Sequence, residues 1–241
     1  MTDVAAEATG PLTGLLVADF TRVLAGPYCT MLLGDLGATV VKVEGPDGDD
    51  TRHWMPPARP GPRGEEATYY LSVNRSKRAV TLDFGDAADL ATARALAARA
   101  DVVVENFKPG GLGRFGLDYP TVRTENPRVV YASISGFGAG SQLPGYDVLA
   151  QALSGLMSVT GSPDGDPAKA GVAIVDVVTG LHAAVGILAA LRHRDVTGEG
   201  QRVEVNLLSS ALSALVNQSG AFAAAGVVPQ RLGNDHPSIH R

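Results

Sequence analysis

The sequence predicts an α/β fold with a doubly wound, mostly parallel sheet, as in the large domain of Rossmann-like proteins. Three observations predict it. Short β-branched runs alternate with longer helical patterns, glycine-bearing turns follow several of these runs, and 241 residues with 45% hydrophobic content suffice for one large core. Because such sheets bind ligands beyond the carboxyl ends of their strands, the loops there are the candidate site.

The elements predicted in the first half follow a β-α-β order. Residues 1–10 are small and polar and predict a flexible tail, whereas residues 45–66 are rich in Pro, Gly, Asp and Arg and predict a long loop that borders a ligand. Strands are predicted over 15–20, 39–43, 79–84, 101–105 and 129–134, and helices over 26–36, ended by Gly37, and over 87–99, capped by Asp86.

The second half is dominated by helices that follow the sheet. Helical spacing is predicted over 147–160, in a long helix from about Asp176 to 197, and through Ala225 after a short strand over 202–207. We therefore assign 11–225 to one large domain and 226–241 to the start of a connection to a further domain. The turn-forming residues at the C-terminal end lead us to expect a chain that was cut rather than completed.

Composition excludes several classes of function. A formal net charge of −5 without a dense Lys/Arg cluster argues against nucleic-acid binding. One cysteine, Cys29, and a start without a signal peptide favour a cytoplasmic protein. The apolar stretch 177–191 is too short to cross a bilayer comfortably and predicts a buried helix, so no membrane association is expected.

Three glycine-bearing loops follow predicted strands, at 21–27, 106–111 and 135–140. Glycine lets the backbone approach a ligand, and free N–H groups at a following helix favour phosphate, so these loops predict a nucleotide-like ligand. Neither a P-loop nor a correctly spaced dinucleotide fingerprint is present. Ordinary structural turns explain the same glycines, and that alternative stays open from the loops alone.

Longer segments resemble a known family. GLLVADFTRVLAGPYCTMLLGDLGATVVKVEGPDGDDTR, ADVVVENFKPGGLGRFGLDY, NPRVVYASISGFG and GVAIVDVVTGLHAAVGILAALRHRDVTGEGQRVEVNLLSSAL are similar, in order, to motifs of family III CoA-transferases, and the similarity runs from about Pro11 to the end. The resemblance implies exchange of CoA between an acyl-CoA and a carboxylic acid, of the small dicarboxylic or the formyl/oxalate type. It also implies an intertwined homodimer and a second, smaller domain that is missing from this sequence.

The resemblance assigns the nucleophile to Asp176, in the segment from Gly171 to Gly180. In the family this aspartate attacks the thioester to give a mixed anhydride and then an aspartyl-CoA thioester. The plain structural alternative is that Asp176 only caps the helix that follows it, and both roles are compatible. A CoA-binding remnant without turnover is a further alternative for this chain.

The resemblance also assigns residues that bind CoA. Phe107 is expected on the adenine, with Lys108 and Arg114 on phosphate, although Phe107 in the core and Arg114 as a solvated charge would be equally ordinary. Gly45-Pro46 replaces a basic position of several relatives, which puts one phosphate contact in doubt. The complete predicted set is Arg22, Leu24, Ala25, Leu82, Asn106, Phe107, Lys108 and Arg114.

Tyr146 separates two chemistries that the resemblance allows. Related α-methylacyl-CoA racemases place a His there as a general base, and tyrosine with an ordinary pKa near 10 is too weak a base. We therefore predict a substrate hydrogen bond for Tyr146, with simple packing as the structural alternative, and keep the racemase as an alternative function. His236 and His240 flank a proline and predict no metal site, and Cys29 is expected to act as a small buried hydrophobe. No cofactor is expected besides CoA, which is a substrate.

Overall fold

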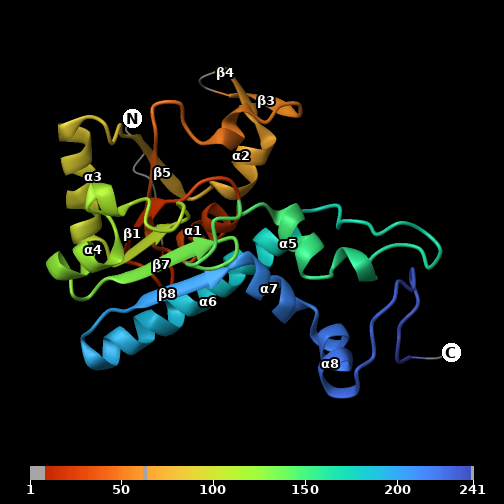
Figure 1. Cartoon of the computed structure of the whole chain (residues 1–241). Helices are drawn as coiled ribbons and strands as arrows, with labels where there is room; N and C mark the ends of the chain where they lie inside the picture. Colours follow the sequence, from red (N-terminus) through yellow and green to blue (C-terminus); the bar gives the residue numbers. More distant parts are fainter. Residues whose placement is uncertain (1–8, 62–63, 240–241) are drawn as a thin grey trace.

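A computed structural model describes residues 9–61 and 64–239, and it has the predicted fold (Figure 1). Its main sheet is parallel throughout and has the strand order β5-β2-β1-β6-β7-β8. The chain moves outward from β1 to β5 and then returns to β6 beside β1, so the topological switch point lies between β1 and β6. The strands are β1 (Leu16–Phe20), β2 (Thr39–Glu44), β5 (Lys77–Thr81), β6 (Val102–Glu105), β7 (Val130–Ser135) and β8 (Arg202–Asn206).

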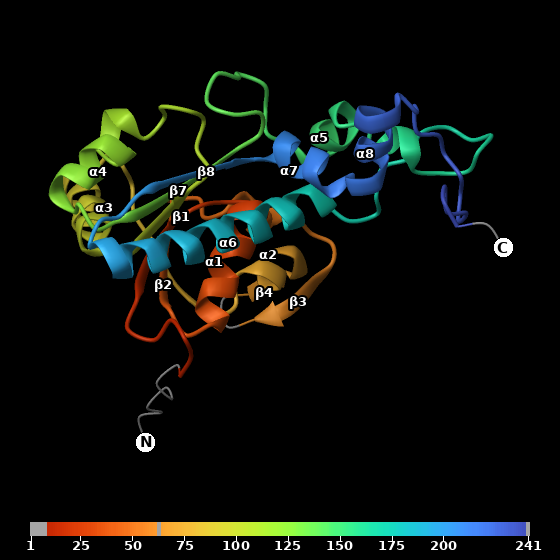
Figure 2. The ribbon, with the colours of Figure 1, turned by 90° about the horizontal axis from the view of Figure 1, so that it is seen from below.

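Helices cover both faces of this sheet, as Figure 2 shows. Alternate residues of a strand point to opposite faces, so Val102 and Val104 pack under α1 (Ala25–Asp35) and α6 (Ile174–Thr197). Val103 and Tyr131 point to the other face, under α3 (Ala87–Arg99) and α4 (Tyr119–Glu125). Burial on both faces explains why the central strands are continuous apolar runs.

Local sequence signals fix the ends of several helices. Asp86 caps α3 as predicted, and its carboxylate accepts from the amides of Ala88 and Asp89. Gly198, with φ +82°, ends α6 in the left-handed conformation. α6 has the length and apolar composition of a membrane-spanning helix, but it packs along the sheet and against α1 as a core helix.

Several predicted boundaries were wrong. Residues 45–66 are not a continuous loop, because they contain the 3₁₀ helix η1 (Asp50–His53) and a hairpin of β3 (Ala58–Gly61) and β4 (Gly64–Ala67). The strand predicted over 79–84 is β5, which begins at Lys77. Helices α2 (Thr68–Val73) and α4 were not predicted, since neither is long enough to show a period.

The helical region after the sheet is more broken than predicted. The helix predicted over 147–160 is α5 (Asp147–Leu153) followed by η3 (Met157–Val159), and the last helix is divided into α7 (Leu207–Ala214) and α8 (Val216–Ala225). Val216 interrupts the helix with φ +39°. The remaining 3₁₀ helix is η2 (Gly113–Phe115).

Beyond α8 the chain returns toward the segment that precedes α6 (Figure 1). The Gly233 amide donates to the Gly161 carbonyl at 3.0 Å, and Arg231 donates to the Ser158 carbonyl at 3.2 Å. Of the tail predicted over 1–10, residues 1–8 lie outside the described residues, and Gly10 is bonded to Thr13. The division into 11–225 and 226–241 stays a prediction.

Candidate active site

The turn after β1 meets the turn after β6 at the switch point. The Asn106 side chain bridges them, because its Oδ1 accepts from the Arg22 amide at 3.0 Å and its Nδ2 donates to the Arg22 carbonyl at 2.7 Å. The Arg22 guanidinium lies 5.4 Å from the centroid of the Phe107 ring. Three of the residues predicted to bind CoA are thus held together where a doubly wound sheet binds ligands.

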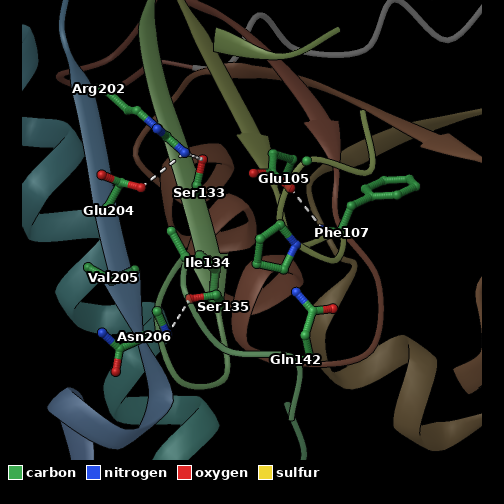
Figure 3. Close-up of a pocket in the computed structure, with 14 residues that line it drawn as sticks. Glu105, Phe107, Ser133, Ile134, Ser135, Gln142, Arg202, Glu204, Val205 and Asn206 are labelled. Atoms are coloured by element: carbon green, nitrogen blue, oxygen red, sulfur yellow. Dashed lines mark hydrogen bonds and ion pairs between the residues drawn. The ribbon is translucent and has the colours of Figure 1, made fainter. Parts of the chain in front are cut away.

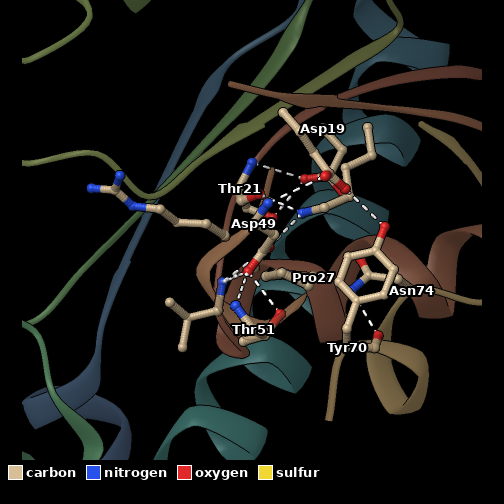
Figure 4. A network of polar contacts seen from close by, with 12 residues as sticks. Asp19, Thr21, Pro27, Asp49, Thr51, Tyr70 and Asn74 are labelled. Carbon is tan, nitrogen blue, oxygen red and sulfur yellow. Dashed lines mark hydrogen bonds and ion pairs between the residues drawn. The ribbon is translucent and has the colours of Figure 1, made fainter. Parts of the chain in front are cut away.

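A cluster of paired charges lies beneath this turn (Figure 4). Lys42 is fully buried, and its ammonium donates to the Thr21 carbonyl at 2.7 Å and to the Asp49 carboxylate at 2.9 Å. Asp19 is also fully buried and accepts from Lys77 at 3.1 Å. Because each buried charge has an opposite partner and further hydrogen bonds, the cluster is stable in a site from which water is excluded.

Asp49 connects this cluster to the backbone of the turn. One of its oxygens accepts from the Thr51 amide at 3.0 Å, and both face the Val23 amide at 3.3 and 3.4 Å. Val23 has φ +70°, a conformation that β-branched residues rarely adopt. This strained turn leads directly into Leu24 and Ala25 at the start of α1. Backbone strain that a fold maintains is typical of functional sites, so the turn is a candidate ligand contact.

Gly180 brings α6 against the same turn. A Cβ at this position would lie 2.6 Å from the Ala25 carbonyl oxygen, so only glycine allows the two helices to approach this closely. Asp176 precedes Gly180 by four residues and lies on the same side of α6. The predicted nucleophile and the predicted CoA contacts Leu24 and Ala25 therefore belong to adjoining helix ends.

The structural alternative, in which Asp176 caps this helix, is wrong. α6 begins at Ile174, so Asp176 is already inside the first turn, and Ala173 at the cap position has no side-chain oxygen to offer. The cap comes from α5 instead, because Asp147 Oδ1 accepts from the amides of Val175 at 2.8 Å and of Asp176 at 3.1 Å. The Asp176 carboxyl group is thereby left available to a ligand.

The Asp176 carboxyl group has an altered acidity. Burial raises its pKa, the negative charge of Asp147 raises it further, and together they bring it to about 7. Tyr69 of α2 lies near enough to be influenced in turn, since burial and then the charges of Asp176 and Asp147 raise its pKa to about 12. A carboxyl group perturbed by burial and by a like charge is typical of functional sites.

An open cleft of about 740 Å³, lined in part by Tyr69, lies between α2 and residues 54–57, which join η1 to β3. Trp54 and Tyr69 form its aromatic wall, with ring centroids 4.9 Å apart in an edge-to-face arrangement. Met55, Pro56, Pro57, Thr68 and Ser72 complete the lining. The segment predicted to border a ligand thus forms one side of the cleft, although it does so with ordered elements.

A separate cavity of about 550 Å³ lies at the carboxyl ends of β6, β7 and β8 (Figure 3). Its wall carries Glu105, whose pKa is raised by burial although Ser133 and the Phe107 amide donate to it, and a surface pair of Arg202 and Glu204 at 3.0 Å. Phe107 lies between this cavity and Arg22. Asp176 lines neither this cavity nor the aromatic cleft, but its charge acts on Tyr69, which lines the aromatic cleft.

Comparison with known proteins assigns the family. The sequence profile of CoA-transferase family III matches residues 12–241. The chain belongs to CoA-transferase family III. Succinate–glutarate CoA-transferase of Agrobacterium fabrum is 46% identical over 95% of this chain and 59% of its own length. Succinyl-CoA:glutarate CoA-transferase of Homo sapiens is 45% identical over 95% of this chain and 52% of its own length.

Solved structures agree with the fold of this family III chain. A CAIB/BAIF family protein from Brucella suis superposes with a TM-score of 0.92 and 44% identity, over 95% of this chain and 62% of that one. The chain spans between about half and about three fifths of the length of these relatives.

The remaining residues predicted for the family III site differ in their exposure to solvent. Leu82 is buried, at 6% exposed, in the core under α3, whereas Lys108 and Arg114 are exposed, with the Arg114 guanidinium 4.5 Å from the Phe115 ring centroid. Tyr146, 65% exposed, precedes α5 directly.

Two further predictions concern metal and thiol chemistry. Cys29 is buried, as predicted, and burial raises the pKa of its thiol. Among residues 9–61 and 64–239 no group of three or more His, Cys, Asp or Glu side chains could hold a metal ion, and His240 lies outside the described residues.

Sequence reasoning missed four residues of this site: Trp54, Tyr69, Asp49 and Asp147. Asp49 and Trp54 lie in the segment 45–66, for which only a loop was predicted, and Tyr69 lies in a segment for which no element was predicted. Asp147 adjoins Tyr146, which was selected, but its partners lie 28 and 29 residues later in the chain. The only available signal was an acidic residue at the expected start of a helix.

Proposed function

We propose that this chain transfers CoA between an acyl-CoA and a carboxylic acid, with the Asp176 carboxylate as the nucleophile. One observation supports this most directly: Asp176 lies in the first turn of α6, beside the strained turn at the switch point and near an aromatic cleft, with a pKa of about 7. The charge that shifts its pKa is that of another carboxylate, Asp147, not that of a cation. A carboxylate of raised pKa is a stronger nucleophile and is still ionised to a large extent at neutral pH.

The reaction uses the carboxylate twice. Asp176 attacks the thioester carbonyl, the C–S bond breaks, and a mixed acyl-aspartyl anhydride and CoA thiolate result. The thiolate then attacks the aspartyl carbonyl and releases the donor acid as its carboxylate, which leaves an aspartyl-CoA thioester. An acceptor carboxylate regenerates Asp176 through the reverse sequence. Holding the thioester against the carboxylate lowers the barrier by up to roughly 7–11 kcal/mol in favourable cases.

CoA is proposed to lie beyond the carboxyl ends of β1 and β6, where the turn of Arg22 meets Asn106. Arg22 and Phe107 offer a cation and a ring face, and the exposed Lys108 and Arg114 supply further positive charge for phosphates. Leu24 and Ala25 then lead toward Asp176. The buried side chain of Leu82 would support this surface from below.

The proposed acids are small dicarboxylates. Relatives with 45–46% identity are named for succinate, glutarate and mesaconate, and oxalate enzymes reach 40% and 44%. The aromatic cleft at Trp54 and Tyr69 has room for a short acid, and Tyr146 lies directly before the capping residue Asp147. We further propose that the whole protein is a cytoplasmic homodimer and needs no cofactor besides its CoA substrates.

Trapping the covalent enzyme tests this proposal. The chain is incubated with succinyl-CoA, treated with hydroxylamine and digested, and mass spectrometry is used to look for a hydroxamate at Asp176. Asp195→Asn is the matched control, because Asp195 is an exposed carboxylate on the same helix. We expect label at Asp176 in the native chain and in Asp195→Asn, and none in Asp176→Asn.

An unlabelled native chain would support the CoA-binding remnant instead. Deuterium exchange at the α-carbon of a 2-methylacyl-CoA without label at Asp176 would support the racemase.

A further inference from the structure

Asp147 occupies an unusual position relative to the proposed nucleophile. Its Oδ1 accepts from the Asp176 amide itself, at 3.1 Å, and from the preceding amide of Val175, at 2.8 Å. The first N–H groups of a helix carry partial positive charge and need an acceptor. Asp147 therefore supplies from α5 the acceptor that the α6 cap residue, Ala173, lacks.

Gln151, one turn later on α5, holds this carboxylate in place. Its Nε2 donates to Asp147 Oδ2, and its Oε1 accepts from the Ala170 amide at 2.8 Å. Gln151 is only 1% exposed, so these hydrogen bonds are protected from water. Both oxygens of Asp147 are thus engaged, and the loop that leads into α6 is tied to the same two side chains.

We propose that Asp147 is a positioning residue for Asp176: one oxygen fixes the first turn of α6, and its negative charge favours the uncharged, acylated Asp176 over the free carboxylate. This rests on the proposed function. When Asp176 becomes an anhydride or a thioester, the negative charge leaves with the CoA thiolate and then with the released acid. The repulsion between two neighbouring carboxylates disappears at that moment, and this shifts the equilibrium toward the covalent enzyme.

Few other charges surround the start of α6. Tyr69 faces it from α2, Tyr28 of α1 contacts Gly180, and Lys169 in the preceding loop is exposed and donates to the Ala170 carbonyl. Tyr69 is uncharged near neutral pH, because burial and the charges of Asp176 and Asp147 raise its pKa to about 12. Asp147 is consequently the charged group that affects the Asp176 carboxyl group most.

Asp147→Asn separates the two parts of the role, because asparagine keeps Oδ1 as an acceptor for the helix amides but removes the charge. The fraction of chain trapped as covalent CoA thioester is measured from pH 5 to 9 with succinyl-CoA as the probe. We expect the midpoint of its pH dependence, near 7 in the native chain, to move down by roughly 1 pH unit in Asp147→Asn. The thioester fraction at pH 8 is expected to fall several-fold.

Asp147→Glu keeps the charge and is expected to retain the native midpoint, whereas a residue with a purely structural role would lower stability without moving the midpoint. An unchanged midpoint in Asp147→Asn overturns the proposal. A native chain that forms no thioester contradicts the proposed function instead.

If Asp147→Asn does not fold, a ¹³C NMR titration of the native carboxyl groups still decides, because an Asp176 carboxyl that titrates near its ordinary pKa of 3.8 also overturns the proposal.

Discussion

Two carboxylate clusters face the same edge of the sheet and have opposite electrostatics. Beneath the turn after β1, Asp19 and Asp49 face Lys77 and Lys42. Burial alone would raise the pKa of each carboxyl, but the ammonium groups outweigh it and hold both below their ordinary value. At the start of α6, by contrast, Asp176 faces Asp147, and burial and repulsion both raise its pKa.

This comparison indicates that the carboxylates that support the structure and the carboxylate proposed to react lie in different electrostatic surroundings. The paired cluster lowers the energy of ionised carboxylates and fixes a strained turn, whereas the unpaired one keeps an ionised carboxylate high in energy and therefore reactive. Glu44 belongs to the first kind, since Arg52 binds it with two hydrogen bonds, at 2.6 and 2.9 Å, and Tyr70 donates to it at 2.8 Å. Substitutions in the two clusters should accordingly change stability in opposite directions.

The largest effect is expected where the paired cluster is broken. Lys42→Met leaves the buried Asp49 carboxylate without its cation and the Thr21 carbonyl without its donor. We expect the free energy of unfolding, measured in urea, to fall by about 3–5 kcal/mol. The double variant with Asp49→Asn should recover part of this loss. If it recovers nothing, packing of the lysine side chain is the cause, not the uncompensated charge.

The unpaired cluster should respond in the opposite direction. Asp176 binds its proton more tightly when folded, with a pKa of about 7 against 3.8, so its ionisation costs stability as pH rises from about 4 through 7. Asp176→Asn removes that cost, and we expect it to stabilise the chain by on the order of 2–4 kcal/mol at pH 8. At pH 4 the gain should vanish. Urea unfolding at both pH values checks this, and Asp195→Asn should be neutral at both. A destabilised Asp176→Asn at pH 8 would contradict the proposed repulsion.

The contact between α1 and α6 gives a third test. Gly180→Ala would place a Cβ 2.6 Å from the Ala25 carbonyl oxygen, and the helices must separate. Overpacking of this kind costs about 1–3 kcal/mol, and we expect slower labelling of Asp176. Gly220→Ala in α8 is the matched control, because nothing lies within 4 Å of its added Cβ. It should stabilise the chain by roughly 0.5–1 kcal/mol and leave labelling unchanged.

Whether a helix or strand could be predicted from the sequence depends on how far apart in the chain the residues that stabilise it lie. The strands with continuous β-branched runs, such as Val102–Glu105, and the capped helix α3 were predicted because their signals are local. The 3₁₀ helix η1 and the helix α2 were missed, since the contacts of Arg52 and Tyr70 with Glu44 that anchor them join residues 8 and 26 positions apart. No local pattern encodes them.

The candidate site divides in the same way. Asp176 came from the family resemblance and not from its surroundings, and the alternative role of a helix cap is wrong. The residue that performs that role, Asp147, is recognised only once α5 is packed against the start of α6. Arg22 and Asn106 were selected separately, and only the parallel sheet brings residues 84 positions apart into contact.

The smallest effect concerns the bridge that joins the two turns at the switch point. Asn106→Ala removes the hydrogen bonds to the Arg22 amide and carbonyl, and because this region is exposed we expect a loss of only about 1 kcal/mol. Asn126→Ala is the matched control. Its side chain also bridges two turns, donating to the Ala100 carbonyl at 2.8 Å and accepting from the Arg128 amide at 3.2 Å, but at the amino end of the sheet.

Both variants should lose similar stability in urea, so a difference in CoA binding between them cannot come from stability. Isothermal titration with free CoA should show weaker binding in Asn106→Ala and native binding in Asn126→Ala. Equal affinities in the two variants would place CoA away from the switch point, because a ligand that lies over this turn must respond when Arg22 is released.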